Sequence, residues 1–412
     1  MFGLIDGNNF YVSCERAFDP TLIGRPVIVL SNNDGCAIAR SAEAKALGIK
    51  MGEVWHLSKR KPEYRSVIAR SSNYALYGDM SRRVFEVLSE SFARVEPYSI
   101  DEMFVDLTEF ARADYCRRVR ERIRRVTKIP TCVGIGPTKT LAKLANKHAK
   151  TASGVSDFSD LDVRREAFAT MPIDEVWGIG CASQTKLNNL GIFTVEQFAA
   201  LTSASVRKLM TVTGQRTHAE LNGVSCLPLA LAPSQRQTVA VTRMFGRLVE
   251  TWEDMREALA AHASRAAEKC RNHGLVANAM VVFFHTHPHN GDPWYHGQRS
   301  FEIEPTSDSF ALISQAVRAG RSMWRPNTRY AKAGVILLDL KSARDMPRDL
   351  LPTADTVRSE KLMAALDAVN NRFGSGTLRP GGIRQVTPWS TRAANRSPRY
   401  TTRLSDLMEV RA

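Results

Sequence analysis

Apolar runs are short throughout this sequence. The longest, Ala279–Phe284 and Ala333–Leu338, span six residues each, whereas a membrane-spanning helix needs about 18 or more. Runs of this length suit buried strands, and elsewhere apolar residues recur at the spacing of amphipathic helices. At about 100–200 residues per domain, a chain of 412 residues forms two to four domains. We therefore predict a globular α+β protein with several separate cores and no membrane segment.

The chain is also strongly basic. Its 57 Lys and Arg residues outnumber its 42 Asp and Glu residues, which gives a formal net charge of +15. This charge favours an anionic partner, nucleic acid ahead of a membrane surface, although it would also serve solubility alone. The seven cysteines are scattered and form no C-x-x-C pair, which argues against a disulfide framework and favours a reducing compartment, the cytoplasm.

The first 230 residues mix short strands with helices. Strand patterns occur at Phe2–Ile5, Val27–Leu30 and Pro130–Gly136, and Tyr98–Leu107 predicts a hairpin. Helical spacing occurs in three stretches, at residues 112–128, at Thr138–Ala149 and, interrupted by glycines, at 161–230.

The remainder of the chain has two parts. A loss of periodicity at Ala232–Gln237 predicts a linker, and alternating strand and helix patterns over 239–345 predict an independent α+β module. Beyond Met346 the sequence is rich in Pro, Gly and Arg, and Leu378–Leu404 holds six arginines and no acid. This composition predicts a basic tail that is partly unstructured until it binds a partner.

Three acids lie at strand ends. Asp6 ends the first predicted strand, and Asp101 and Glu102 lie within the predicted hairpin. Carboxylates that meet at one sheet edge repel one another unless cations lie between them, and Mg²⁺ is the usual cation where the substrate brings phosphates. Two such ions can bind the attacking and leaving oxygens of a phosphoryl transfer, with the carbonyl of Gly7 as a further ligand. For each acid alone, an ordinary surface position at a strand end is the better explanation.

Long strings of the sequence, in the same order, resemble the Y-family translesion DNA polymerases, and within them the UmuC-like branch. The resemblance runs nearly end to end. The strings that carry it are Asp6–Tyr11, Ser31–Cys36, Glu43–Gly48, Tyr98–Glu102, Val133–Gly136, Thr138–Ala145, Val176–Gly180 and Ser397–Thr402.

The resemblance implies an α+β multidomain fold shaped as a right-hand polymerase with an additional little-finger domain. The implied parts are a palm, fingers, a helical thumb with a helix-hairpin-helix-like turn, a linker, an α+β little finger and a basic C-terminal tail. Their expected ranges are 1–12 and 75–160 for the palm, 13–74 for the fingers, 161–231 for the thumb, 232–241 for the linker, 242–345 for the little finger and 346–412 for the tail.

The resemblance also implies roles around the palm. Asp6, Asp101 and Glu102 match the catalytic carboxylates that hold two Mg²⁺ ions. Tyr11 matches the steric gate, a residue that stacks under the incoming sugar and excludes a 2′-hydroxyl, although it could also be a packing aromatic beside Phe10. Cationic contacts to the triphosphate are implied for Lys45, Lys150 and Arg40.

Outside the palm, the resemblance implies contacts to the DNA backbone. Gly178, Gly180 and Lys186 match a helix-hairpin-helix turn, whose glycines let backbone N–H groups approach a phosphate. Arg243 and Arg247 are candidates in the little finger. Contacts of this kind hold a duplex without reading its sequence.

The implied function is error-prone, template-directed DNA synthesis past damaged bases in the SOS response. Its substrates would be a DNA primer-template and a dNTP, and its partners a processed UmuD-like dimer and a recombinase filament. The protein would act at the nucleoid in the bacterial cytoplasm. Sliding-clamp binding stays open, because Arg344–Pro352 has Leu350 and Leu351 but neither the Gln nor the aromatic residue of a Q-x-x-L-F clamp peptide.

Other functions share parts of this pattern. A two-metal nuclease or a nucleotidyl cyclase can use the same acids, because palm-like sheets serve several chemistries, but the thumb and little-finger strings argue against both. A catalytically silent DNA-binding scaffold derived from a polymerase is the alternative of a different class. The intact acids and Tyr11 argue against it, since loss of catalysis would release these positions.

Overall fold

The computed structural model describes residues 1–108, 112–232, 235–288, 291–345, 354–385 and 387–407. The chain forms two compact units. The first unit comprises Met1–Pro233 and Ala394–Ala412, and the second comprises Ser234–Ala393. The chain therefore passes between the units twice. Within the described ranges, none of the helices has the length and apolar character needed to cross a membrane.

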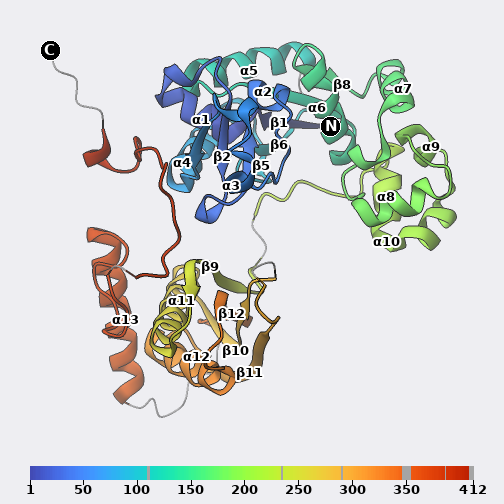
Figure 1. Cartoon of the computed structure of the whole chain (residues 1–412). Helices are drawn as coiled ribbons and strands as arrows, with labels where there is room; N and C mark the ends of the chain where they lie inside the picture. The colour runs from blue at the N-terminus through green and yellow to red at the C-terminus, as the bar shows by residue number, and fades with distance from the viewer. Residues whose placement is uncertain (109–111, 233–234, 289–290, 346–353, 386, 408–412) are drawn as a thin grey trace. The chain divides into compact units, whose positions relative to one another are not determined.

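A five-stranded sheet forms the centre of the first unit (Figure 1). Its strands, in spatial order, are β5 (Val95–Pro97), β6 (Glu102–Asp106), β1 (Phe2–Gly7), β7 (Thr131–Gly136) and β8 (Val155–Asp157). β1 is antiparallel to both neighbours, and β7 is parallel to β8. The predicted hairpin is confirmed, although its first strand, β5, lies wholly before the predicted range, and residues 98–101 connect its two strands.

Helices cover both faces of this sheet. α4 (Tyr74–Ser91) and α5 (Arg112–Thr127) pack on the face that includes Ile5, and α6 (Lys139–Thr151) packs on the face that includes Leu4. Alternate residues of a strand point to opposite faces, so β1 contributes to both layers of the core. A side chain at Gly134 of β7 would come within 2.1 Å of the α6 backbone, so the close approach of this helix requires glycine.

A smaller sheet lies beside the first one. β2 (Val27–Leu30) is its central strand, with β3 (Ala37–Arg40) antiparallel on one side and β4 (Ile68–Ser71) parallel on the other. All four residues of β2 are buried, as its continuous apolar run predicts. Short helices accompany this sheet, namely α1 (Phe10–Phe18), α2 (Ala42–Ala46), α3 (Trp55–Ser58) and the 3₁₀ turns Pro20–Leu22, Asn32–Asp34 and Pro62–Tyr64.

The next part of the first unit is helical apart from its connections, as predicted for residues 161–230. Its elements are α7 (Leu161–Thr170), a 3₁₀ turn at Ile173–Glu175, α8 (Cys181–Asn188), α9 (Val195–Ala199) and α10 (Ser203–Leu221). Side-chain caps fix several helix starts; Thr194 and Gln197 form a capping box on α9. The core of this part is continuous with Leu141 and Leu144 of α6.

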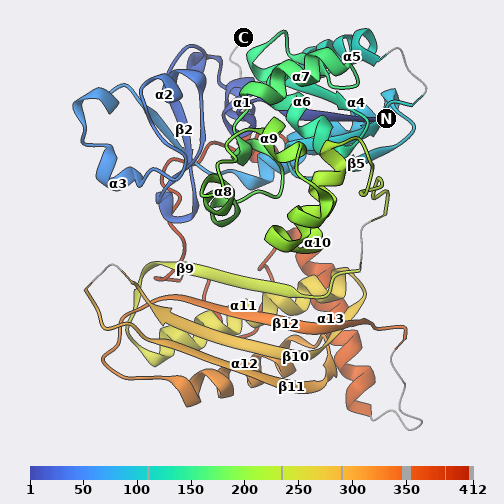
Figure 2. The same ribbon diagram turned by 90° about the vertical axis from the view of Figure 1, so that its right-hand side faces the viewer.

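The second unit contains a four-stranded antiparallel sheet with helices on one face (Figure 2). Its strands, in spatial order, are β11 (His296–Thr306), β10 (Leu275–Thr286), β12 (Tyr330–Ser342) and β9 (Val239–Val249). α11 (Trp252–Asn272) and α12 (Ser309–Met323) pack against this sheet and bury its core. The α+β module predicted over 239–345 is confirmed, with strands longer than their apolar runs.

The described part of the tail contains structure that its composition does not predict, while partial disorder before a partner binds stays a prediction. α13 (Ala354–Phe373) is a long helix, and a second element is the 3₁₀ turn Leu404–Asp406. Arg271 of α11 pairs with Asp367 of α13 at 2.7 Å, and Trp389 is buried in the core of the second unit. Residues 394–407 then join the first unit. The composition of the tail does not predict these contacts, because the residues that the tail contacts lie far away in the sequence.

Candidate active site

Two strands bring three acids to one edge of the five-stranded sheet. Asp6 of β1 lies directly opposite Glu102, the first residue of β6. Asp101 immediately precedes β6, and its carbonyl accepts a hydrogen bond of 2.9 Å from the N–H of Gly7. The register thus places acids that are distant in sequence next to one another, as the strand pattern predicts.

Asp6 is nearly buried, with 7% of its surface exposed. Lys150 of α6 lies with its Nζ 2.9 Å from the Asp6 carboxylate. Burial raises the pKa of Asp6 above its usual value, and the charges of Glu102 and Asp101 raise it further, while Lys150 opposes both effects. The three acids are therefore close enough to repel one another.

Glu102 has a lysine partner of its own. Lys143 of α6 places its Nζ 2.9 Å from the Glu102 carboxylate and also lies over the rings of Tyr98 and Trp177. The sequence pattern alone does not single out Lys143. The only signal in the sequence is a row of lysines at steps of four on this helix. The other two lysines of that row have different partners: Lys139 pairs with the buried Glu96, and Lys147 pairs with Glu175.

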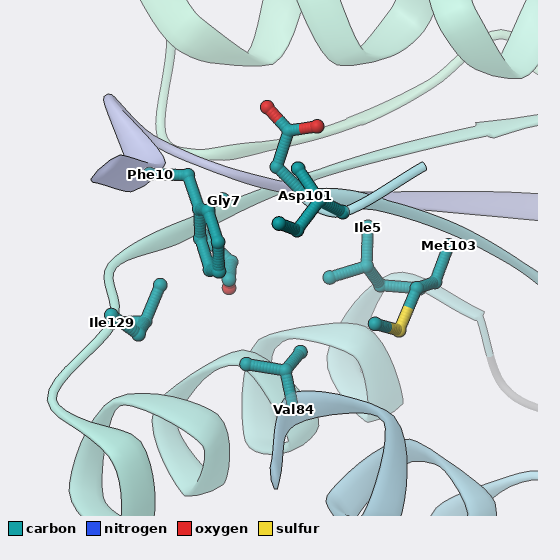
Figure 3. A pocket seen from close by; sticks show the side chains of 9 residues that line it. Ile5, Gly7, Phe10, Val84, Asp101, Met103 and Ile129 are labelled. Carbon is teal, nitrogen blue, oxygen red and sulfur yellow. The ribbon is translucent and has the colours of Figure 1, made fainter. Parts of the chain in front are cut away.

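The third acid is held differently. The hydroxyl of Ser99 donates to the Asp101 carboxylate at 2.6 Å. Figure 3 shows this carboxylate directed away from a small apolar cavity beneath it, whose lining includes Val84 and Ile129. The cavity measures about 10 Å³, so it has room for at most a single water molecule. The Asp101 carboxylate is therefore not part of this cavity and lies on its outer side.

The acids fit a hard divalent cation by their chemistry. Carboxylate and carbonyl oxygens are the ligands that Mg²⁺ prefers, and the backbone of this sheet edge brings Asp6, Asp101 and Glu102 together. In the part of the chain that the structure describes, no three His, Cys, Asp or Glu side chains form a group that could hold a metal ion. Lys150 and Lys143 instead balance two of the acids.

Further cations lie near Asp6. Lys45 of α2 donates from Nζ to Asn9 Oδ1 at 2.8 Å. Burial lowers its pKa most, and the charges of Arg40 and Lys150 lower it further, so these three cations are close enough to interact. Arg40 also donates to the carbonyl of Ile49 at 2.7 Å. The structure thus brings together all three of the expected triphosphate-binding residues.

Tyr11 belongs to a group of three tyrosines. It lies in the first turn of α1, and its ring stacks on Tyr77 of α4 with centroids 4.6 Å apart and an angle of 17°. Tyr74 contacts it edge-on at 6.0 Å. Burial raises the pKa of Tyr11 to about 12, so its hydroxyl is neutral. The centroid of the Phe10 ring lies 6.0 Å from that of Tyr11. By centroid distance, Tyr77 is thus the closer ring partner.

The expected DNA-binding residues divide between the two units. Gly178, with a φ of 91° that favours glycine, and Gly180 lie just before α8, and the exposed Lys186 lies on that helix. Arg243 and Arg247 are exposed residues of β9 in the second unit, where Arg247 pairs with Asp254 at 3.3 Å. The Arg344–Pro352 stretch, considered above as a clamp peptide, lies largely outside the described residues.

Comparisons with known proteins agree over the full chain. A family model described as the impB/mucB/samB family matches residues 5–147, and the model of its C-terminal domain matches 236–350. Residues 360–410 match a domain of unknown function.

Similar curated proteins include Protein UmuC of Salmonella typhimurium, which is 42% identical with 100% of each chain covered. Protein MucB of Escherichia coli is 39% identical, with 98% of this chain and 97% of that protein covered. DNA polymerase IV 1 of Bacillus subtilis is 27% identical, with 92% and 91% covered.

A solved Y-family DNA polymerase chimera shares the fold, with a TM-score of 0.64 and 19% identity. The match covers 82% of this chain and 99% of the chimera. This likeness shows the fold, and the full-length identity to Protein UmuC fixes the family. The chain belongs to the impB/mucB/samB family and is a UmuC-like Y-family DNA polymerase.

Proposed function

We propose that this translesion polymerase extends a primer 3′-hydroxyl with a dNTP opposite damaged template bases, with low fidelity, as part of the SOS response. The observation that supports this most directly is the juxtaposition at one sheet edge. Asp6, Asp101 and Glu102 meet at this edge, Lys150 pairs with Asp6, and Lys45 lies near Asp6 with Arg40 as its own neighbour. Clustered acids suit divalent metals, and neighbouring cations suit the triphosphate that such metals bring.

In this proposal the three acids and the Gly7 carbonyl hold two Mg²⁺ ions. When bound, the ions would activate the primer hydroxyl and stabilise charge on the departing pyrophosphate. Lys45, Lys150 and Arg40 would neutralise the triphosphate; lysine gives a point charge that suits a mobile polyphosphate. Tyr11, supported by its stack on Tyr77, would exclude nucleotides that carry a 2′-hydroxyl.

We assign the domain roles as the family resemblance implies. Residues 1–12 and 75–160 form the palm, 13–74 the fingers, 161–231 the thumb and 242–345 the little finger. The backbone of the primer-template would be held at two places. One is the turn at Gly178 and Gly180 with Lys186, and the other is Arg243 and Arg247 on β9. The proposed partners are a processed UmuD-like dimer and a recombinase filament. The sliding clamp stays an open candidate. The proposed location is the nucleoid.

Primer extension on undamaged and abasic templates tests this proposal, in parallel with and without a UmuD-like dimer. Asp101→Asn and Glu102→Gln keep the side-chain size and remove the charge. Each should reduce dNTP incorporation by about 100-fold or more, because the metals supply several kcal/mol of transition-state stabilisation. Binding of the primer-template, measured by fluorescence anisotropy, should stay within about twofold of the parent value, because these acids do not contact the duplex backbone in this proposal.

Asp114→Asn is the matched control, because Asp114 is an exposed acid in the first turn of α5. It should leave incorporation unchanged. Full activity of both charge-neutral site variants would reject the metal assignment. A parent enzyme that binds DNA but incorporates nothing, with or without the dimer, would instead favour the silent scaffold.

A further inference from the structure

Residues 394–402, here termed the C-terminal strap, have no part in the function proposed above. They belong to the first unit, together with α1 and α4, although the preceding tail residues belong to the second. They include the Ser397–Thr402 string and fall within the matched domain of unknown function. Their contacts with the first unit indicate a role for them.

The strap first adds to the smaller sheet. The N–H of Ser71, the last residue of β4, donates to the carbonyl of Asn395 at 3.0 Å, and the N–H of Asn395 donates back to the Ser71 hydroxyl at 3.0 Å. Ser71 and Arg396 form a parallel bridge. The N–H of Ala394 donates to the Asp34 carboxylate at 3.0 Å. These contacts fix the path of the strap along the edge of β4.

The strap then inserts a serine into a buried polar cluster. Asn73, the N-cap of α4, donates to the carbonyl and hydroxyl oxygens of Ser397 at 3.0 Å each and to the carbonyl of Pro398 at 3.1 Å. The Ser397 hydroxyl donates to Glu15 Oε1 at 2.9 Å, and the Tyr77 hydroxyl donates to the same oxygen at 2.6 Å. Glu15 and Asn73 are each 1% exposed.

Glu15 depends on these two donors. Burial raises its pKa, and the hydrogen bonds from Tyr77 and Ser397 are the largest opposing effects. A buried acceptor that loses a donor is destabilised more than an exposed one. Removal of the Ser397 hydroxyl would therefore disturb Glu15 and, through it, the hydrogen bond that fixes the outer end of the Tyr77 ring.

Tyr77 connects this cluster to the nucleotide site. Its ring is fully buried and stacks on Tyr11 with centroids 4.6 Å apart. On the other side of the strap, Tyr400 stacks on Phe18 at the end of α1, with centroids 4.9 Å apart and an angle of 5°. The strap thus contacts the C-terminal half of α1, the helix that carries Tyr11, and also the start of α4.

We propose that Ser397 is a positioning residue for sugar selection. It fixes Glu15, Glu15 fixes the Tyr77 ring, and the Tyr77 ring sets the plane of Tyr11. The proposal rests on the role proposed above for Tyr11. How well a side chain excludes a hydroxyl by direct contact depends on where that side chain lies. A displacement of about 1 Å can reduce selectivity or rate strongly. The C-terminal strap would therefore contribute to the exclusion of ribonucleotides without touching the nucleotide.

The test compares kcat/KM for a dNTP with kcat/KM for the matching rNTP in the full-length enzyme. Ser397→Ala and Tyr77→Phe each remove one hydroxyl from the chain of contacts. Each should lower the ratio by about threefold to tenfold, the effect of one hydrogen bond, with most of the change in the rNTP value. Ser397→Thr, which keeps a hydroxyl, should retain at least part of the discrimination.

Ser390→Ala is the matched control. Its hydroxyl lies in the same tail but bonds to Thr387, in the second unit, so the ratio should equal that of the parent. Tyr11→Ala gives the value expected when the gate is lost. The double variant Tyr11→Ala, Ser397→Ala should match Tyr11→Ala alone, because no ring is left to position.

The outcomes separate the two proposals. If Tyr11→Ala discriminates as well as the parent, the gate itself is rejected, whatever the Ser397 variants do. If Tyr11→Ala loses discrimination but Ser397→Ala and Tyr77→Phe lower both kcat/KM values equally, the cluster has only a structural role and the positioning proposal is overturned. Should Ser397→Ala fail to fold, as thermal unfolding would show, Tyr77→Phe decides in the same way.

Discussion

The pKa of Asp6 is set by its burial and by neighbouring charges of both signs. Burial and the charges of Glu102 and Asp101 raise its pKa, and Lys150 acts in the opposite direction. The acids can be anticipated from strand ends in the sequence, because a strand pattern fixes which residues reach the edge. The lysines cannot be assigned in this way. Lys143 and Lys150 lie on one helix, and only the packing of α6 on the sheet decides which acid each one meets.

Lys45 gives a prediction at the scale of one side chain. Lys45→Gln removes a cation that donates to Asn9 and lies near Asp6, so the KM for dNTP should rise about tenfold or more, as expected for a lost charge-assisted contact. The kcat should change less. Steady-state single-nucleotide incorporation measures both values. Lys50→Gln, a change to an exposed lysine of the same segment, should have no effect, and equal effects of the two variants would contradict a specific contact.

Strand β7 shows what local pattern can and cannot determine about an element. Its apolar run predicts a buried strand, and the helical spacing of the following residues predicts α6; both are confirmed. The closeness of their packing is not visible locally. Gly134 and Gly136 bring the backbone of α6 so near that any side chain would collide with it. The contacts of the tail are not visible locally for a related reason, since Ser397 and Trp389 bond to partners 382 and 132 residues away.

Gly134→Ala tests this packing. The added Cβ would lie 2.1 Å from Ala142 O and Asn146 N, so β7 and α6 must separate, and the free energy of unfolding should fall by about 1–3 kcal/mol or more. Denaturant unfolding followed by circular dichroism gives the value. Gly78→Ala is the matched control, because Gly78 lies in α4 with open space around it; a helical Ala there should stabilise by up to about 1 kcal/mol. A neutral Gly134→Ala would contradict the close approach.

On the scale of the whole molecule, the two units differ in how they are built from the chain. The second unit is one continuous segment, Ser234–Ala393, whereas the first needs Ala394–Ala412 in addition to Met1–Pro233. Contact between these two segments of the first unit includes buried hydrogen bonds as well as a ring stack. The sequence pattern predicts the second unit as a module but gives no sign that the first unit is discontinuous.

A truncation after Ala393 should therefore affect the two units unequally. The first unit loses the partners of Asn73, Glu15 and Phe18, and the amides of α1 and α4 should exchange faster by about tenfold or more, because a buried polar cluster is left incomplete. Amides of α11 should keep their protection, since the partners of that helix remain. Hydrogen exchange followed by mass spectrometry resolves the units. Equal protection of α1 and α4 in both forms would show that the strap does not stabilise them.

The distance along the chain between Glu15 and Ser397 has a consequence during synthesis. The two residues are 382 positions apart, and ribosomes add about 5–20 residues per second, so about 20 to 80 s pass before the carboxylate can receive its second donor. The nascent polymerase can fold its N-terminal layers early, but their polar interior stays incomplete until translation reaches the strap. The layers that carry Glu15 and Tyr77 are thereby left without one of their hydrogen-bond donors until Ser397 has been made.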